Sequence, residues 1–334
     1  MSELQERLQK FGTRQAVLLG RLVVALHRDI LKLLSLAWQG LVNAFIRTGE
    51  LTKKAVTTQR SAFRGASDAD ILPRDKGHSS ELEDRRADLP ARVTHAPAGQ
   101  CIYAIGDVHG RYDLLLKLLD KIDADIADLP EETEVILVFL GDYVDRGLQS
   151  RQVFDLLMSD RMQAYTPVFL MGNHEESVLR FREDATFGRE WARFGGGETL
   201  YSYGLQPPSS ASGANPDAWH AVWSQFREVF PPAHLDFVQS MQHYVIIGDY
   251  LFVHAGLRPN VAIEDQSVDD MLWIRDTFLT DDETFPYLVV HGHTPAHAPY
   301  IDNRRMGLDT GAFSSGILTA AKFFGTDIGI IKTG

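Results

Sequence analysis

Four short polar motifs, each following an apolar run, constrain the fold of this chain more than any other feature of its sequence. The apolar runs, such as 101–105 and 135–140, have the length and composition of buried strands. Open α/β sheets gather functional groups at the carboxyl ends of their strands, so we expect the motifs to meet in one site. The motifs are G-D-V-H-G at 106–110, G-D-Y-V-D-R-G at 141–147, G-N-H-E at 172–175 and H-G-H-T at 291–294.

The side chains of these motifs are suitable metal ligands. Asp107 and His109 are two residues apart, so both point the same way if the chain stays extended. Asp142 has two oxygens and could bridge two ions, whereas Asn173 could bind only through a neutral amide oxygen. Two divalent cations activate water and neutralise phosphate oxygens, so this set predicts a two-metal phosphoester hydrolase. Two later apolar runs lead into further candidates, His254 and His293.

Taken singly, each of these residues also has an ordinary interpretation. A lone Asp or His at a strand end is more often a cap or a satisfied polar contact than a ligand. The ordered occurrence of all the motifs argues against that interpretation here. Helical patterns at 112–126, 151–159 and 175–181 alternate with the strands, which predicts an α/β layered core. Residues 244–253 predict a hairpin.

In this order the motifs resemble those of the bacterial-type PPP phosphoprotein phosphatases of the calcineurin-like metallophosphoesterase superfamily, over about residues 100–330. The resemblance implies a four-layer α/β/β/α sandwich that holds two divalent metal ions. Manganese is the metal that the family suggests, and the nitrogen and oxygen donors would also accept iron or zinc. The resemblance assigns the first metal to Asp107, His109 and Asp142, and the second to Asp142, Asn173, His254 and His293.

The resemblance also gives roles to residues that touch no metal. His174 is similar to the general acid that protonates the leaving oxygen, and Asp145 to the carboxylate that fixes its tautomer. Arg146 resembles a phosphate clamp, because a guanidinium can pair two phosphate oxygens at once. Arg275 resembles the second clamp of bacterial members, and its alternative is a surface ion pair with a nearby aspartate.

The chain departs from the eukaryotic members of this family. Met171 stands where many of them have an arginine, and their C-terminal groove motifs are not found. Residues 191–203 instead resemble an insert of the bacterial members, so we expect a helical or looped insert over 185–240 that overhangs the site and shapes substrate choice. His291 is expected to be a neighbour of the metals rather than a ligand. Asp309 is expected to be either a partner of the ligands or a turn residue.

The function favoured by these features is hydrolysis of phosphomonoesters, such as phosphoserine or phosphothreonine of proteins, by attack of a metal-bridging hydroxide. The close alternative is a symmetrical dinucleoside tetraphosphatase or related pyrophosphohydrolase, which would share the metal site. Those relatives often replace the aspartate at the position of Asp145, so its presence favours phosphomonoesters. A third alternative is an inactive membrane-associated binding module, against which the complete ligand set argues.

Composition narrows the class of protein further. The net charge of -12 argues against nucleic-acid binding by the chain as a whole, because such proteins neutralise phosphates with basic surface. The single cysteine, Cys101, excludes an intramolecular disulfide and fits a reducing compartment. We therefore expect a cytoplasmic bacterial enzyme whose partners are phosphorylated proteins or small phosphoesters.

The first 55 residues differ from the rest, with nine Lys or Arg against four Asp or Glu. Apolar residues recur there every three or four positions, which predicts an amphipathic helix. Its longest uncharged run, 33–46, is shorter than the roughly 20 residues of a spanning helix. The helix could lie on the inner membrane face, bind a helical partner, fold back as a lid or pack on its own domain. A polar flexible linker is expected over 56–97, and the catalytic domain over 98–334.

Overall fold

The structure is a computed structural model that describes residues 92–334, apart from 210–214 and 283. The helix predicted over 1–55 and most of the linker predicted over 56–97 lie outside the described residues. The last residues of that linker segment contact the catalytic domain, where the Thr94 hydroxyl donates to the Tyr250 hydroxyl at 2.9 Å. Within the described ranges, no helix is long and apolar enough to cross a bilayer.

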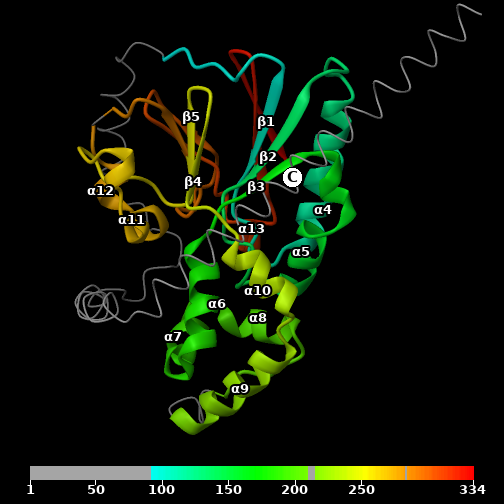
Figure 1. Cartoon of the computed structure of the whole chain (residues 1–334), viewed down its shortest axis with the longest axis vertical. Helices are drawn as coiled ribbons and strands as arrows, with labels where there is room; N and C mark the ends of the chain where they lie inside the picture. Colours follow the sequence, from blue (N-terminus) through cyan, green and yellow to red (C-terminus); the bar gives the residue numbers. More distant parts are fainter. Residues whose placement is uncertain (1–91, 210–214, 283) are drawn as a thin grey trace, which may run out of the picture. The chain divides into compact units, whose positions relative to one another are not determined.

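Two mixed β-sheets form the centre of the catalytic domain (Figure 1). In the first sheet, ordered β10-β9-β1-β2-β3, strands β1, β2 and β3 are parallel to one another. Strand β9 is antiparallel to both of its neighbours, β1 and β10. Its strands are β1 (Gln100–Ile105), β2 (Glu134–Phe139), β3 (Thr166–Phe169), β9 (Thr319–Phe324) and β10 (Asp327–Lys332). The second sheet, ordered β4-β5-β6-β8-β7, contains β4 (Tyr244–Ile247), β5 (Tyr250–Val253), β6 (Leu288–His291), β7 (Tyr300–Ile301) and β8 (Arg305–Gly307).

Alternation along the strands builds the four layers. In β1, Tyr103 and Ile105 face helix α4 (Tyr112–Ile126), whereas Ile102 and Ala104 face the second sheet. In β5, Tyr250 and Phe252 face the first sheet, whereas Leu251 and Val253 face the opposite side. Successive strand side chains point to opposite faces, so each sheet can pack a core on both sides. The predicted α/β/β/α sandwich is confirmed.

Helices cover the two outer faces and one end of the sandwich (Figure 1). Helices α4 and α5 (Ser150–Leu157) lie on the first sheet, and α11 (Val268–Trp273) and α12 (Asp276–Leu279) lie on the second. The end helices are α6 (Asn173–Glu183), α7 (Gly188–Arg193), α8 (Gly196–Ser202), α9 (Pro216–Val229) and α10 (Pro232–Gln239). Short elements complete the order: α13 (Ala312–Ser315), η1 (Asp160–Ala164), η2 (Ala185–Phe187) and η3 (Ile263–Asp265).

The predicted elements agree with the structure except at some ends. The helix at 112–126 and the hairpin at 244–253 have the predicted bounds. Helix α6 begins at Asn173, two residues before its predicted start. The reason is that its first residues, Asn173 and His174, are polar groups turned into the site, so the apolar helical pattern begins later than the helix itself.

The packing between the sheets yields a stability prediction. Phe323 is fully buried and packs against Tyr250 across the interface, with the two rings tilted and their centroids 4.5 Å apart. We expect Phe323→Ala to lower the free energy of unfolding by about 3–5 kcal/mol because it leaves a cavity between the sheets. Urea denaturation measures this. Ile330→Ala, at a 43% exposed position on the adjacent strand, is the control and should change much less.

Candidate metal centre

The strand ends bring the four motifs together. The loop after β1 carries Asp107 and His109, the loop after β2 carries Asp142, and α6 begins with Asn173 soon after β3. The second sheet contributes His254 directly after β5 and His293 two residues after β6. All six predicted ligands are buried, with exposures of 4% or less, and lie where the sequence predicted the site.

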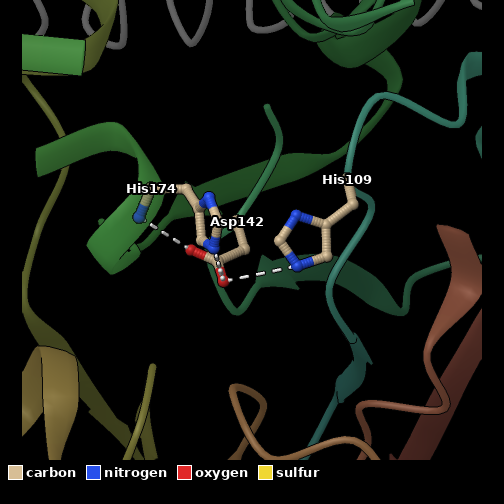
Figure 2. Close-up of side chains that lie close together, drawn as sticks. All are labelled: His109, Asp142 and His174. Carbon is tan, nitrogen blue, oxygen red and sulfur yellow. Dashed lines mark hydrogen bonds and ion pairs between the residues drawn. The ribbon is translucent and has the colours of Figure 1, made fainter. Parts of the chain in front are cut away.

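Asp142 lies at the middle of this cluster. Figure 2 shows its carboxylate between the imidazoles of His109 and His174, whose Nε2 atoms are 3.6 and 3.8 Å from Asp142 Oδ2. The second oxygen, Oδ1, accepts the His174 backbone N–H at the start of α6 and lies 3.4 Å from His254 Nε2. One oxygen of Asp142 therefore faces His109 and His174, and the other faces His254.

Two groups of side chains have the geometry to hold a metal ion. The donor atoms of His109, Asp142 and His174 lie within 4.8 Å of one another, as do those of Asp142, His254 and His293. Asn173 belongs with the second group, since its Oδ1 is 2.9 Å from both His254 Nε2 and His293 Nδ1. Asp142 is common to both groups, which is the arrangement expected of a bridging carboxylate.

The hydrogen bonds of the histidines fit divalent cations. Nδ1 of His254 bonds to the Leu140 carbonyl, which leaves its Nε2 unprotonated and only 2.9 Å from the acceptor oxygen of Asn173. Nδ1 of His109 likewise bonds to the Val144 carbonyl, and its buried Nε2 has no hydrogen-bond partner. Two acceptors facing each other, and a buried lone pair without a donor, are satisfied by a cation.

Burial keeps the imidazoles in the form that binds metals. Desolvation lowers the pKa of His109, His254 and His293, so these rings are neutral at physiological pH. Burial, together with the charges of Asp309 and Asp142, raises the pKa of Asp107. Several carboxylates are thus held close together in a dry site, an arrangement that positive ions stabilise.

Asp309 lies beside this cluster, as one of its two predicted roles requires. Its Oδ1 accepts the Gly311 N–H at 2.8 Å, and its buried Oδ2 has no hydrogen-bond partner. Burial raises the pKa of Asp309 to about 6, with the charge of Asp142 acting in the same direction. Asp309 therefore combines a turn contact with a place among the acidic groups of the centre.

Unusual backbone conformations hold several site residues. His109, Asp142, Asp145 and His293 all have left-handed φ angles, of 45°, 53°, 69° and 64°. Such conformations are costly for residues with a Cβ, and surrounding contacts must impose them. Gly292 is needed for a close approach, because a Cβ there would lie 2.0 Å from Asp107 Oδ1.

His174 and Asp145 form a buried pair at the edge of the centre. Nδ1 of His174 is 2.7 Å from Asp145 Oδ2, which leaves His174 Nε2 directed towards Asp142. The same carboxylate accepts the Trp191 indole N–H at 2.9 Å and the Thr199 hydroxyl at 2.6 Å. The sequence does not predict Trp191 and Thr199 as site residues, because no spacing rule connects them to Asp145.

Glu175 is a third site residue, after Trp191 and Thr199, for which the sequence predicts no role. Its two oxygens accept backbone N–H groups of Asp142, Tyr143, Val144 and Gly172 at 2.8–3.2 Å. Burial and the Asp142 charge raise its pKa to about 8, while these four donors favour the ionised form. Glu175 thereby ties the loop that carries Asp142 to the start of α6. The only sequence feature that could have indicated this role is the position of Glu175 within the motif G-N-H-E.

The two predicted phosphate clamps lie beside different halves of the centre. Burial is the main cause of the lowered pKa of His109, and the positive charge of Arg146 is the second. For His293 the second cause is the positive charge of Arg275. The Arg146 guanidinium stands over the ring of Phe313, 4.8 Å from its centroid. Arg275 is partly buried at the start of α12. Both predicted clamps are therefore close enough for their charges to act on the candidate ligands.

Comparison with known proteins agrees with this geometry. The model of the calcineurin-like phosphoesterase family matches residues 102–315, which include every predicted site residue. The chain belongs to this family. The family uses divalent metals in pairs, and the donor groups described above are able to hold them.

The relatives of this phosphoesterase include named enzymes. Two are called bis(5'-nucleosyl)-tetraphosphatase PrpE [asymmetrical]. The one from Geobacillus sp. is 30% identical over 66% of this chain and 89% of its own, and the one from Halalkalibacterium halodurans is 28% identical over 66% and 88%. A crystal structure provisionally described as a diadenosine tetraphosphatase aligns with a TM-score of 0.48 and 20% identity, over 72% of this chain and 96% of that one.

The two histidines of H-G-H-T provide a matched test of the centre. His293 faces Asn173, whereas His291 Nε2 accepts from Arg305 at 3.1 Å and its Nδ1 bonds to the Gly292 carbonyl. We expect His293→Gln to bind about one metal ion per chain instead of about two, because a ligand is removed. His291→Gln should retain both. Metal analysis after dialysis measures this, and equal losses in the two variants would contradict the assignment.

Proposed function

We propose that this phosphoesterase cleaves dinucleoside tetraphosphates at a phosphoanhydride bond. The observation that carries the proposal is the likeness to relatives named bis(5'-nucleosyl)-tetraphosphatase, which align over nearly nine tenths of their own length. This replaces phosphoprotein hydrolysis, which the motifs favoured, as the leading function. The presence of Asp145, taken as a sign of phosphomonoester substrates, carries less weight than this likeness.

In this proposal, the centre would hold two divalent ions. Asp107, His109 and Asp142 would hold the first, and Asp142, Asn173, His254 and His293 would hold the second. Asp107 replaces His174, a member of the first group of donors, because His174 is kept for the acid. When bound, the ions lower the pKa of water and neutralise phosphate oxygens. The nitrogen and oxygen donors suit manganese, iron or zinc.

The side chains around the ions have separate tasks in the reaction. Arg146 and Arg275 pair with phosphate oxygens and align the phosphorus for in-line attack. The oxygen of a water molecule forms a bond to phosphorus and loses its proton to solvent, while the bond from phosphorus to the leaving oxygen breaks. The leaving oxygen keeps the electron pair and takes a proton from His174 Nε2 where it needs one. His174 then regains a proton from water.

One feature favours a second function, the hydrolysis of phosphomonoesters such as phosphoserine. A polyphosphate leaves readily as an anion, whereas an alkoxide is a strong base and needs a proton as the bond breaks. The His174–Asp145 pair is fully buried and tightly bonded, which is the support that an acid for a poor leaving group requires. Phosphorylated proteins therefore stay as the second candidate substrate class.

Hydrolysis of diadenosine tetraphosphate and of a phosphoserine peptide, measured side by side with manganese, separates the two functions. We expect a higher kcat/KM for the dinucleotide, with ATP and AMP as products, because the relatives are named asymmetrical. Chromatography identifies the products, and two molecules of ADP would indicate the symmetrical reaction. Asp107→Asn is the inactive control. A preference for the peptide would establish the phosphomonoester function instead.

The role of His174 has its own test. We expect His174→Asn to lower kcat on phenyl phosphate on the order of 100-fold and kcat on p-nitrophenyl phosphate much less, since p-nitrophenolate leaves without a proton. Metal content should be unchanged. A loss of metal would show that His174 is a ligand, as its distance from Asp142 permits.

A further inference from the structure

We infer that Thr199 and Trp191 are positioning residues that hold the acid His174 through Asp145. Both lie in the segment 185–240, which the sequence predicted only to overhang the site and shape substrate choice. The inference rests on the role proposed for His174, and it does not depend on whether the preferred substrate is a dinucleotide.

Thr199 grips Asp145 at two points. Its hydroxyl donates to Asp145 Oδ1 at 2.6 Å and accepts the Asp145 backbone N–H at 2.8 Å. A single hydroxyl can do both because it has one proton and two lone pairs. The side chain and backbone of Asp145 are therefore fixed relative to helix α8. Thr199 and Asp145 are both fully buried, so water does not compete for these bonds.

Trp191 completes the hold on the carboxylate. Its indole N–H donates at 2.9 Å to Asp145 Oδ2, the same oxygen that bonds His174 Nδ1 at 2.7 Å. The indole itself is immobilised by packing on Phe181 and Phe226, with ring centroids 4.9 and 5.7 Å away. The Trp191 indole, the Thr199 hydroxyl and the His174 imidazole thus all bond to the Asp145 carboxylate. The indole and the hydroxyl fix the orientation of the carboxylate, and the carboxylate in turn orients the imidazole.

The same segment supports the next residue, Arg146. Its backbone N–H donates to the Gly195 carbonyl at 3.1 Å, just before α8. Asp145 and Arg146 both have left-handed φ angles, of 69° and 65°, which need outside contacts to persist. A Cβ at Gly196 would lie 2.3 Å from the Trp191 ring, so glycine allows α8 to approach the indole. Within the run G-G-G at 195–197, the packing of α8 against the indole therefore requires glycine at position 196.

A role limited to anchoring the fold makes a different prediction. Thr199 also contacts the Ser150 hydroxyl at 3.1 Å, so it joins α8 to α5. If that were its whole task, losing the hydroxyl would slow the hydrolysis of every substrate alike. If Thr199 positions the acid, the loss must depend on the basicity of the leaving group.

The test compares Thr199→Val with Thr199→Ser on phenyl phosphate and p-nitrophenyl phosphate, using the full chain loaded with manganese. Thr199→Val should lower kcat on phenyl phosphate at least about tenfold and kcat on p-nitrophenyl phosphate less than about threefold. Thr199→Ser keeps the hydroxyl and should restore most of the loss. Trp191→Phe removes only the indole N–H, whereas Thr199→Val removes a donor and an acceptor. The loss of kcat on phenyl phosphate in Trp191→Phe should therefore lie between the losses in Thr199→Ser and Thr199→Val.

Thr94→Val is the matched control. It also removes a buried threonine hydroxyl, but one bonded to Tyr250, at the opposite end of β5 from His254. This control should lower stability without changing the ratio of the two rates. Equal losses on both substrates in Thr199→Val, or no rescue by serine, would overturn the inference. A wild-type chain without activity on phenyl phosphate would also overturn it, whereas a lack of tetraphosphatase activity would refute only the proposed substrate.

Discussion

The buried carboxylate of Asp142 is the constraint on which the centre depends. Its oxygens serve two groups of donors contributed by both sheets, so the position of one side chain links the two halves of the sandwich. A carboxylate this deep is stable only among donors and positive charge. The fold supplies one such donor, the His174 backbone N–H at the start of α6, and divalent cations would match the imidazole and amide groups around the carboxylate.

Rigid placement of these donors has a conformational cost. Left-handed φ angles recur at His109, Asp142, Asp145 and His293, each of them in one of the four polar motifs. Contacts made elsewhere maintain these conformations, including the four backbone bonds of Glu175 and the double contact of Thr199. The strain lies in short loops between well-packed strands, which is where a fold can impose it with least disturbance.

The site combines parts suited to two kinds of leaving group. Paired metal-binding groups and flanking arginines suit a polyphosphate chain, and the likeness to tetraphosphatases supports that substrate. A buried acid pair suits an ester whose leaving oxygen is strongly basic. The segment 185–240 contributes to this pair directly, so the same helices that border the site also support its chemistry.

The sequence by itself determined the strands that lead into the motifs, the order of the motifs and the identity of the six candidate ligands. It could do so because ligand types at strand ends form a local pattern, and parallel strands bring those ends together. It did not determine which imidazole nitrogen faces the centre, nor the contacts of Trp191 and Thr199 with Asp145, which lies 46 and 54 residues earlier. Those contacts depend on how α7 packs against α6 and α9 and how α8 packs against α5 and α7. Only the tertiary structure decided them, because a hydrogen bond between distant segments is set by packing and leaves no periodic signal in the chain.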